Sequence, residues 1–250
     1  MRGLIVILQK ELRSLWVTPL AWVLLTLFLL LQGVTFYTIV VHFTTLPPDE
    51  AALGPLPAYL GQDSLLLTLM LLLLCPALSM RSFAEERKSG AMEILLASPI
   101  GAAGLVLGKY LATLLTYVVF WLPTLLYAWA LRGSAPVDFR TVATGYLGIL
   151  LAGASSLAIG TLMSALSKSQ VLALMLTISA EFGLFLLGLG ENVFDSGPLR
   201  ELGSYVSLST MQNELSRGLI DSRRIVFHLS LTLWALFVTQ LVVESWRHES

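Results

Sequence analysis

The sequence of 250 residues contains little charge and little of the chemistry that soluble proteins usually carry. Asp, Glu, Lys and Arg make up 12% of the residues, against about a quarter in a soluble domain. The net charge is −1, so no nucleic-acid partner is expected. Cys75 is the single cysteine, which excludes a disulfide within the chain and a cysteine metal site.

The residues of common enzyme active sites are also missing. His42, His228 and His248 lie far apart in the sequence without metal-ligand spacing, so we expect no metal site. The sequence has no Gly-x-Ser-x-Gly elbow and no pair of carboxylates within its apolar runs. We therefore do not expect an enzyme.

One segment, Gly104–Tyr110, resembles part of the phosphate-binding loop of nucleotide-binding proteins. That loop requires Gly and then Ser or Thr where this sequence has Ala103 and Tyr110, and it follows a strand that is not expected here. The better interpretation of Lys109 is a lysine whose ammonium group reaches the interface from the inner end of a span. We expect no ATP to bind to this chain through that segment.

Apolar residues, by contrast, make up 56% of the sequence and gather in long runs. Six runs come close to the length of about 20 residues that a helix needs to cross a bilayer. Their approximate bounds are 19–41, 64–80, 105–131, 141–166, 171–189 and 225–243. These runs predict an all-α polytopic membrane protein with one transmembrane domain over residues 1–250. The first run is too long for a cleaved signal peptide, and no small-residue cleavage site follows it.

The distribution of Lys and Arg predicts the orientation in the membrane. With both termini in the cytoplasm, nine of the 15 Lys and Arg residues lie on the inner side, and the first outer loop, 42–63, contains none. The expected location is the inner (cytoplasmic) membrane of the cell.

Residues 81–99 form the densest polar segment between two predicted spans. Charged residues come first and an apolar helical stripe follows: Glu85, Glu86, Arg87, Lys88, Met92, Glu93, Leu95 and Leu96. Such a segment is too polar for hydrocarbon and suits the cytoplasmic interface, where it offers a surface to a soluble partner. The alternative is a solvated turn, but the segment is about three times longer than a helix hairpin requires.

Three prolines predict where helices begin or bend. Ser98–Pro99 has the N-cap and N1 pattern of a helix start, so the third long helix is expected to run from there to Leu131. Pro76 and Pro123 are expected to kink or break the helices that contain them.

The predicted outer segment, 191–224, is more than a tether. A capping-box pair and an apolar stripe at helical spacing occupy its second half: Ser209, Gln212, Met211, Leu215 and Leu219. Gly218 suits the position after a helix end. We expect one or two short helices on the outer face and a polar contact between Arg217 and Asp221, which are four residues apart.

Glu181 is the unusual residue of the fifth apolar run. A carboxylate at that depth normally faces protein or a wet cavity, because ionisation in hydrocarbon costs at least about 2.5 kcal/mol. One hypothesis makes it a pathway or gating residue. The other makes it a protonated glutamate that bonds to a neighbouring span, for instance to Gln32 or Ser156. The sequence leaves both open.

Small residues recur at four-residue spacing in the fourth run: Gly148, Ala152, Ser156, Gly160 and Ser164. Such a face lets helices approach closely in lipid. Packing within the chain is favoured over a seam between two copies.

A further group of residues points to a family. Around the polar segment these are Phe83, Ala84, Glu85, Glu86, Arg87, Gly90, Glu93, Leu95, Leu96, Ser98, Pro99, Gly108 and Lys109. Before the last run stands the segment Arg217–Asp221. With the six-span layout, these residues resemble the permease subunits of type-2 ATP-binding-cassette (ABC) exporters, in particular the gliding-motility and nitrous-oxide-reductase-maturation types. Ala91 departs from the pattern, because that family often has Thr there.

The resemblance implies the partners. A separate cytoplasmic ATPase subunit would hold ATP and Mg²⁺, and no cofactor would bind to this chain. The segment 81–99 would contact that subunit as an amphipathic coupling helix through Glu85, Glu86, Arg87, Lys88, Met92, Glu93, Leu95 and Leu96. A second permease copy or a related permease would complete the membrane part, and an extracytoplasmic accessory protein is an optional partner. The outer-face motif would be Arg217, Gly218 and Asp221.

Three hypotheses for function remain. The first is an exporter permease driven by the partner ATPase. The second is a module that uses the same ATPase for mechanical or assembly work. The third is a polytopic scaffold or receptor that does not couple to ATP. No motif identifies a substrate, although apolar spans slightly favour lipid-linked or amphipathic cargo.

Overall fold

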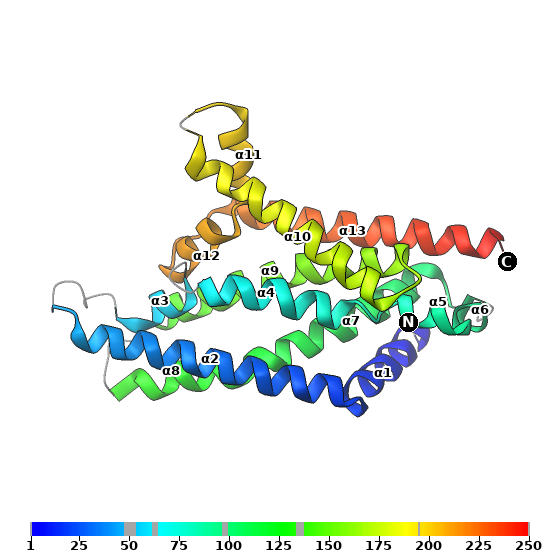
Figure 1. Ribbon diagram of the computed structural model, residues 1–250, viewed down its shortest axis with the longest axis horizontal. Coiled ribbons are helices and arrows are strands. Elements are labelled where there is room, and N and C mark those ends of the chain that lie inside the picture. Colours follow the sequence, from blue (N-terminus) through cyan, green and yellow to red (C-terminus); the bar gives the residue numbers. More distant parts are fainter. Residues whose placement is uncertain are drawn as a thin grey trace.

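The computed structural model describes residues 2–47, 54–61, 65–96, 100–133, 138–194 and 196–249. These residues are almost entirely helical, and none of them lies in a strand. Figure 1 shows long helices that run roughly side by side, with short helices at both ends. The prediction of an all-α fold is confirmed.

The long helices account for the predicted spans. Within the described residues, five segments are long and apolar enough to cross a membrane: Pro19–Thr45, Ala102–Gly133, Phe139–Leu166, Gln170–Glu191 and Ser222–Trp246. The helices that contain them are α2 (Pro19–Thr45), α7 (Ala102–Trp121) with α8 (Leu125–Ala130), α9 (Phe139–Leu166), α10 (Gln170–Val193) and α13 (Ser222–Glu249). The predicted span 64–80 corresponds to the shorter helix α4 (Leu65–Ser79), which packs against α2, α9 and α10.

Short helices gather at the two ends of the bundle. One end, here called the α5 end, carries α1 (Arg2–Val17), α5 (Ala84–Ser89) and α6 (Ala91–Leu96), and the chain terminus of α13 lies there too (Figure 1). The other, the α12 end, carries α3 (Pro55–Leu60), α11 (Pro198–Val206) and α12 (Leu208–Ser216). The last two are the short helices expected in the segment 191–224.

The central helix is α9, which contacts α4, α7, α10, α12 and α13. Its small residues make this possible. A Cβ atom at Gly148 would lie 2.8 Å from the side chain of Leu215 in α12, and one at Gly160 would lie 2.7 Å from the Cβ of Ser79 in α4. Real Cβ atoms do not approach non-bonded atoms this closely, so larger residues would push the helices apart. The ladder of small residues therefore serves packing within the chain.

The third long helix differs from the expected one. Pro123 lacks an N–H group and cannot continue the α-helical hydrogen-bond pattern, so α7 ends at Trp121 and a 3₁₀ turn, Leu122–Thr124, leads into α8. α7 begins at Ala102, with Gly101 as its N-cap. The expected start at Ser98–Pro99 lies outside the described residues. Pro76, by contrast, sits within α4 without ending it.

The helix α1 was not among the predicted elements. Its apolar face packs along α7, and Gly108 permits the approach, because a Cβ atom there would lie 2.8 Å from the side chain of Ile7. Exposed apolar residues such as Ile5 and Val6 remain on other parts of its surface. The helix therefore joins the bundle at the α5 end, where it can also meet the polar segment.

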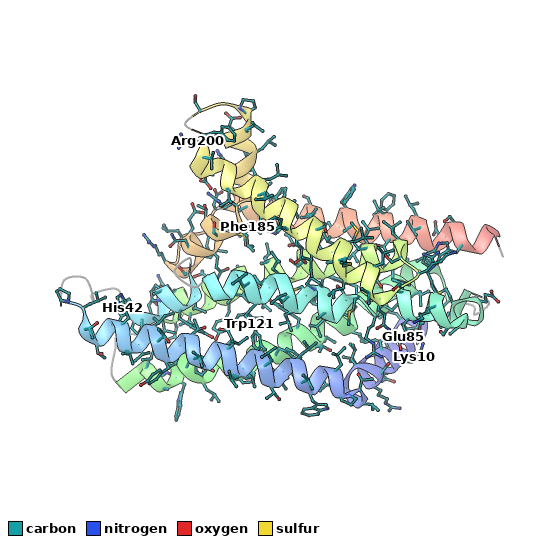
Figure 2. All side chains as sticks on the ribbon, in the orientation of Figure 1. Lys10, His42, Glu85, Trp121, Phe185 and Arg200 are labelled. Atoms are coloured by element: carbon teal, nitrogen blue, oxygen red, sulfur yellow. The ribbon has the colours of Figure 1, made fainter. Side chains whose placement is uncertain are left out.

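Aromatic side chains fill the interior between α2, α3 and α7. The ring centroid of Phe28 lies 4.9 Å from that of Trp121, which Figure 2 shows in the middle of the bundle. The hydroxyl group of Tyr59 donates to Gln32 Oε1 at 2.9 Å. Gln32, one of the two partners considered for Glu181, is therefore engaged with α3 instead.

Candidate functional site

A cluster of charged side chains ties three helices together at the α5 end. Lys109 of α7 is 1% exposed, and its Nζ atom lies 2.8 Å from Glu11 Oε1 of α1 and 2.7 Å from Glu86 Oε2 of α5. Lys10 Nζ lies 2.8 Å from the other oxygen of Glu86. Two lysines thus meet two carboxylates, and the charges balance. Figure 2 labels Lys10 and Glu85 at this end of the molecule.

The neighbouring carboxylates alter the pKa of Lys10. Burial by itself lowers that pKa, but the hydrogen bond to Glu86 and the charges of Glu86 and Glu11 outweigh it and raise the pKa above its ordinary value of 10.5. Lys10 is therefore protonated at neutral pH and stays available as the second cation of the cluster.

The start of α5 is fixed to the end of α9. Ser164 Oγ accepts hydrogen bonds from the backbone N–H groups of Phe83 at 3.0 Å and Ala84 at 3.1 Å, and it donates to Met80 O at 2.9 Å. The first N–H groups of a helix have no partner within that helix, so a hydroxyl group from another helix takes the role of the cap. The serine at the end of the small-residue ladder therefore positions the polar segment.

Arg87 makes a second connection to α9. Its Nη1 atom donates to Ala165 O at 2.6 Å, at the C-terminal end of α9, where the helix dipole favours a cation. The guanidinium group also lies 4.5 Å from the ring centroid of Trp246 in α13. The resemblance assigned Arg87 to the contact with an ATPase, but its described contacts are within the chain.

The other residues expected at the ATPase contact divide into two groups. Met92 is 5% exposed and belongs to the hydrophobic core, and Leu95 packs against the same core, so neither forms a free apolar anchor. Lys88 and Glu93 are exposed, and Glu85 is exposed beside Arg81, whose Nε lies 2.8 Å from Glu85 Oε2. The side chain of Leu96 lies outside the described part of the structure.

The expected single coupling helix is two helices joined at Gly90. Gly90 has φ +75°, a left-handed conformation that ends α5. The chain then turns into α6, and Lys88, Ser89, Gly90 and Glu93 are exposed around the turn. Glycine suits this position because other residues adopt a positive φ only at a cost. The turn is thus a solvent-facing surface held by buried contacts beneath it.

Glu181 lies in a pocket in the middle of the bundle. It is 7% exposed, and Ser156 of α9, the second partner considered for it, lines the same pocket. The pocket also contains Ser155 and His228, together with apolar residues of α4, α10, α11, α12 and α13. The prediction that Glu181 faces protein or a cavity, and not lipid, is confirmed.

Comparison with known families now places the molecule. Residues 38–242 match the family described as ABC-2 family transporter protein, which is well over half of the chain. The chain belongs to the ABC-2 transporter family. It is a multi-pass membrane protein and a permease component of an ABC transporter. Comparison with curated proteins found no match. The narrower resemblance to the gliding-motility and nitrous-oxide-reductase-maturation types stays a prediction.

The α12 end of this ABC-2 protein has an ion cluster of its own. Arg224 Nε lies 3.1 Å from Glu214 Oε2 and 3.8 Å from Asp221 Oδ2, and Arg224 Nη2 lies 3.7 Å from Glu191 Oε1. Asp221 also accepts from the backbone N–H of Arg223 at 2.9 Å. Asp221 is thus paired with Arg224, and the expected contact with Arg217 is wrong. Arg217 is exposed.

The sequence indicated only partly which residues begin and end the helix α12. Its N-cap is Ser207, whose Oγ accepts from Thr210 N at 3.3 Å, so the expected capping box at Ser209 and Gln212 is wrong. Gln212 Nε2 instead donates to Leu60 O at 2.6 Å and to Gly145 O at 3.0 Å. The expected stop at Gly218 is confirmed: it has φ +80°, and its N–H donates to Leu215 O at 3.1 Å.

Sequence analysis missed several residues of these sites: Lys10, Glu11, Ser164, Arg224 and His228. For the charged residues among them, the sequence contains only a weak signal. Lys109 is a lone cation within an apolar run, and such a cation requires an acidic partner if it is buried. The sequence contains the acids but does not show which of them the fold brings near.

Proposed function

We propose that this ABC-2 protein is the membrane-spanning subunit of an exporter, and that a separate cytoplasmic ATPase docks on the exposed turn between α5 and α6. The Lys and Arg distribution supports a cytoplasmic α5 end, with both termini on that side. The same docking would serve substrate export or mechanical work across the membrane. ATP and Mg²⁺ belong to the partner in this proposal.

One observation carries the proposal. The α5–α6 turn exposes Lys88 and Glu93, while the residues beneath it connect to three long or amphipathic helices through Glu86, Arg87 and the cap from Ser164. A solvated turn would need none of these buried contacts. A turn that transmits force needs all of them, because a load on a loosely held loop would be lost as local motion.

The geometry also supports a route for the motion. An ATPase that moves α5 would displace Lys109 and Glu11 through Glu86, and hence α7 and α1. It would displace the C-terminal end of α9 through Arg87 and Ser164. Because α9 lies at the centre of the bundle, a shift there would reach α4, α10 and α13 together.

The experiment is a charge reversal at the exposed turn. In tagged protein purified from its native membranes, Lys88→Glu with Glu93→Lys should reduce co-purified ATPase subunit several-fold, because complementary charges at an interface set recognition. Neither side chain belongs to the buried contacts, so folding should be unchanged. The matched control is Arg223→Glu, an exposed charge at the α12 end, which should keep the ATPase bound.

The outcome separates the hypotheses. Loss of the ATPase in the turn variant alone supports the permease. Equal retention in both variants, or no ATPase with the unaltered protein, favours the scaffold or receptor that does not couple to ATP. Variants of Arg87 are unsuitable for this purpose, because Arg87 bonds to α9 and its loss would disturb the fold as well as any docking.

The sidedness has an independent test. In a Cys75→Ala background, a cysteine at Ser89 should be protected from an impermeant thiol reagent in intact cells, and one at Thr44, near the end of α2, should react. Both positions are exposed, so a difference in labelling reports the side of the membrane. The reverse pattern would overturn the orientation.

A second copy of the chain, or a related permease, is also proposed as a partner on the basis of family membership. Disulfide crosslinking across α10, which is apolar and largely exposed over much of its length, tests it. A crosslinked dimer formed by cysteines at Leu176 and not at Leu233 of α13 would identify α10 as the contact helix.

A further inference from the structure

The pocket around Glu181 has a composition that the exporter function does not explain. It is a partly open pocket of about 50 Å³ between α4, α9, α10 and α13, and most of its wall is apolar. Two polar atoms of its lining, Glu181 Oε1 and His228 Nε2, are buried without a hydrogen-bond partner among the described residues. Such atoms are rare in folded proteins, because each costs about 1–3 kcal/mol unless it is satisfied. A ligand that satisfies both would explain them.

The hydrogen bonds fix what His228 offers to that ligand. Ser155 Oγ donates its single hydrogen to Ala152 O at 2.9 Å. The same oxygen lies 2.9 Å from His228 Nδ1, and with its hydrogen on Ala152 O it accepts from Nδ1. A neutral imidazole with its hydrogen on Nδ1 has a lone pair on Nε2. His228 thus presents an acceptor to the pocket.

Glu181 offers a second acceptor when its carboxyl group is ionised. Its Oε1 atom is buried without a partner among the described residues and is left for a further contact. The described lining residues include neither Lys nor Arg. An ionised carboxylate in an apolar setting therefore lacks a counter-charge from its own pocket, and a bound cation would supply it.

We propose that this pocket binds a primary ammonium group at the end of a short aliphatic chain. One N–H group donates to Glu181 Oε1 and another to His228 Nε2, while the carbon chain lies on apolar residues such as Leu184 and Leu231. The volume suits a few heavy atoms, since one water needs about 10–15 Å³ of such space. A carboxylate has no donor for these acceptors, a phosphate would bring negative charge to an ionised Glu181, and a quaternary ammonium group has no N–H.

The proposal concerns binding by this chain alone and does not rest on the partner ATPase. Its failure would leave the exporter function standing, and failure of the ATPase docking experiment would leave the pocket standing. If both hold, the amine is the kind of group that the protein recognises within the membrane.

The experiment follows the imidazole nitrogens of the full chain in detergent micelles. The protein is labelled with ¹⁵N-histidine, the signal of His228 is assigned by its absence in His228→Gln, and butylammonium chloride is titrated at neutral pH. The unprotonated Nε2 resonance of His228 should move and saturate, while those of His42 and His248 stay in place. Thermal unfolding should shift upward over the same concentration range.

Matched probes and variants make the result specific. 1-Butanol, tetramethylammonium and butyrate should bind at least about tenfold more weakly, because a hydrogen bond to a charged group contributes about 1.5–3 kcal/mol. Glu181→Gln, which keeps the shape, should weaken butylammonium by a similar factor. Glu201→Gln, an exposed position on α11, should change nothing.

Two results would overturn the proposal. One is a hydrogen on Nε2 of His228, because the pocket would then present a donor. The other is that butylammonium changes neither the Nε2 resonance nor the unfolding midpoint, or that 1-butanol changes both equally. In the last case the pocket would hold apolar groups of any kind.

Discussion

The two ends of the bundle each place a buried cation among carboxylates, and they do so differently. At the α5 end, Lys109 is 1% exposed and its two carboxylate partners are 13% and 16% exposed, at 2.7 and 2.8 Å. At the α12 end, the partners of Arg224 are 20–40% exposed and lie 3.1–3.8 Å away. The first cluster is less exposed to water, has shorter distances between its charged atoms and is balanced in charge. The second has an excess of negative charge and access to water.

The difference shows where the molecule is rigid. Electrostatic attraction is stronger where water is excluded, but so is the cost of leaving one member unpaired. The α5 end joins Glu11, Glu86 and Lys109 from separate helices, so a displacement of one must displace the others. The α12 end can rearrange with water in place of protein partners. An exporter driven from the α5 end would need this combination of a rigid end that transmits motion and an end that can rearrange.

The largest effect is expected from Lys109→Gln. It leaves Glu11 and Glu86 with Lys10 as their remaining cation, and loss of one member of a buried pair costs about 3–5 kcal/mol. Chemical unfolding in detergent micelles, followed by circular dichroism, measures it. The control is Lys168→Gln, an exposed lysine after α9, which should stay within about 0.5 kcal/mol of wild type. Similar values for the two variants would contradict the contrast between the ends.

Arg224→Gln should cost less, about 2 kcal/mol, because its carboxylate partners can be hydrated when it is lost. Salt sharpens the comparison. Raising the ionic strength to about 1 M should shrink the effect of Arg224→Gln, since partly exposed charges are screened. The effect of Lys109→Gln should change little. Equal salt dependence of the two variants would show that water and ions reach the two clusters equally.

Ser164→Ala should cost about 1–2 kcal/mol, because it leaves the N–H groups of Phe83 and Ala84 without their acceptor in a buried place. The loss should be local. Hydrogen exchange should increase at the start of α5 and stay unchanged in α12 at the other end. An increase spread evenly over both ends would mean that Ser164 acts on the whole bundle and not on the polar segment.

The elements that the sequence predicted well are those with a signal along the chain. Apolar runs of bilayer length gave the long helices, and Gly218 gave the end of α12. The helix α1 was missed because charged residues interrupt its apolar face and because it is shorter than a helix that crosses a bilayer. The N-cap of α12 was misplaced by two residues, from Ser207 to Ser209, because both are serines before an apolar stripe.

The site depended on contacts between distant parts of the chain, which a single sequence does not show. Glu86 meets Lys10 across 76 positions, and Lys109 meets Glu11 across 98. The acids and bases of the polar segment looked available for a partner, yet the fold uses Glu86 and Arg87 internally. Met92 likewise looked available as an anchor for a partner, but the fold buries it in the core. Among the assigned residues whose side chains the structure describes, Glu85, Lys88 and Glu93 are exposed, and Glu85 is paired with Arg81.

The smallest effect belongs to Lys10, the outer cation of the α5 cluster, whose side chain is 53% exposed. Its pKa is raised in the folded protein, so its contribution to stability is complete below the ordinary value of 10.5 and is lost as pH rises through the folded value. Lys10→Met should therefore unfold slightly more easily than wild type at pH 7, by less than about 1 kcal/mol, as for other exposed pairs. The two proteins should converge above pH 10.5. Unfolding midpoints at a series of alkaline pH values measure this, and a gap that widens with pH would show that Lys10 stabilises the fold by packing and not by charge.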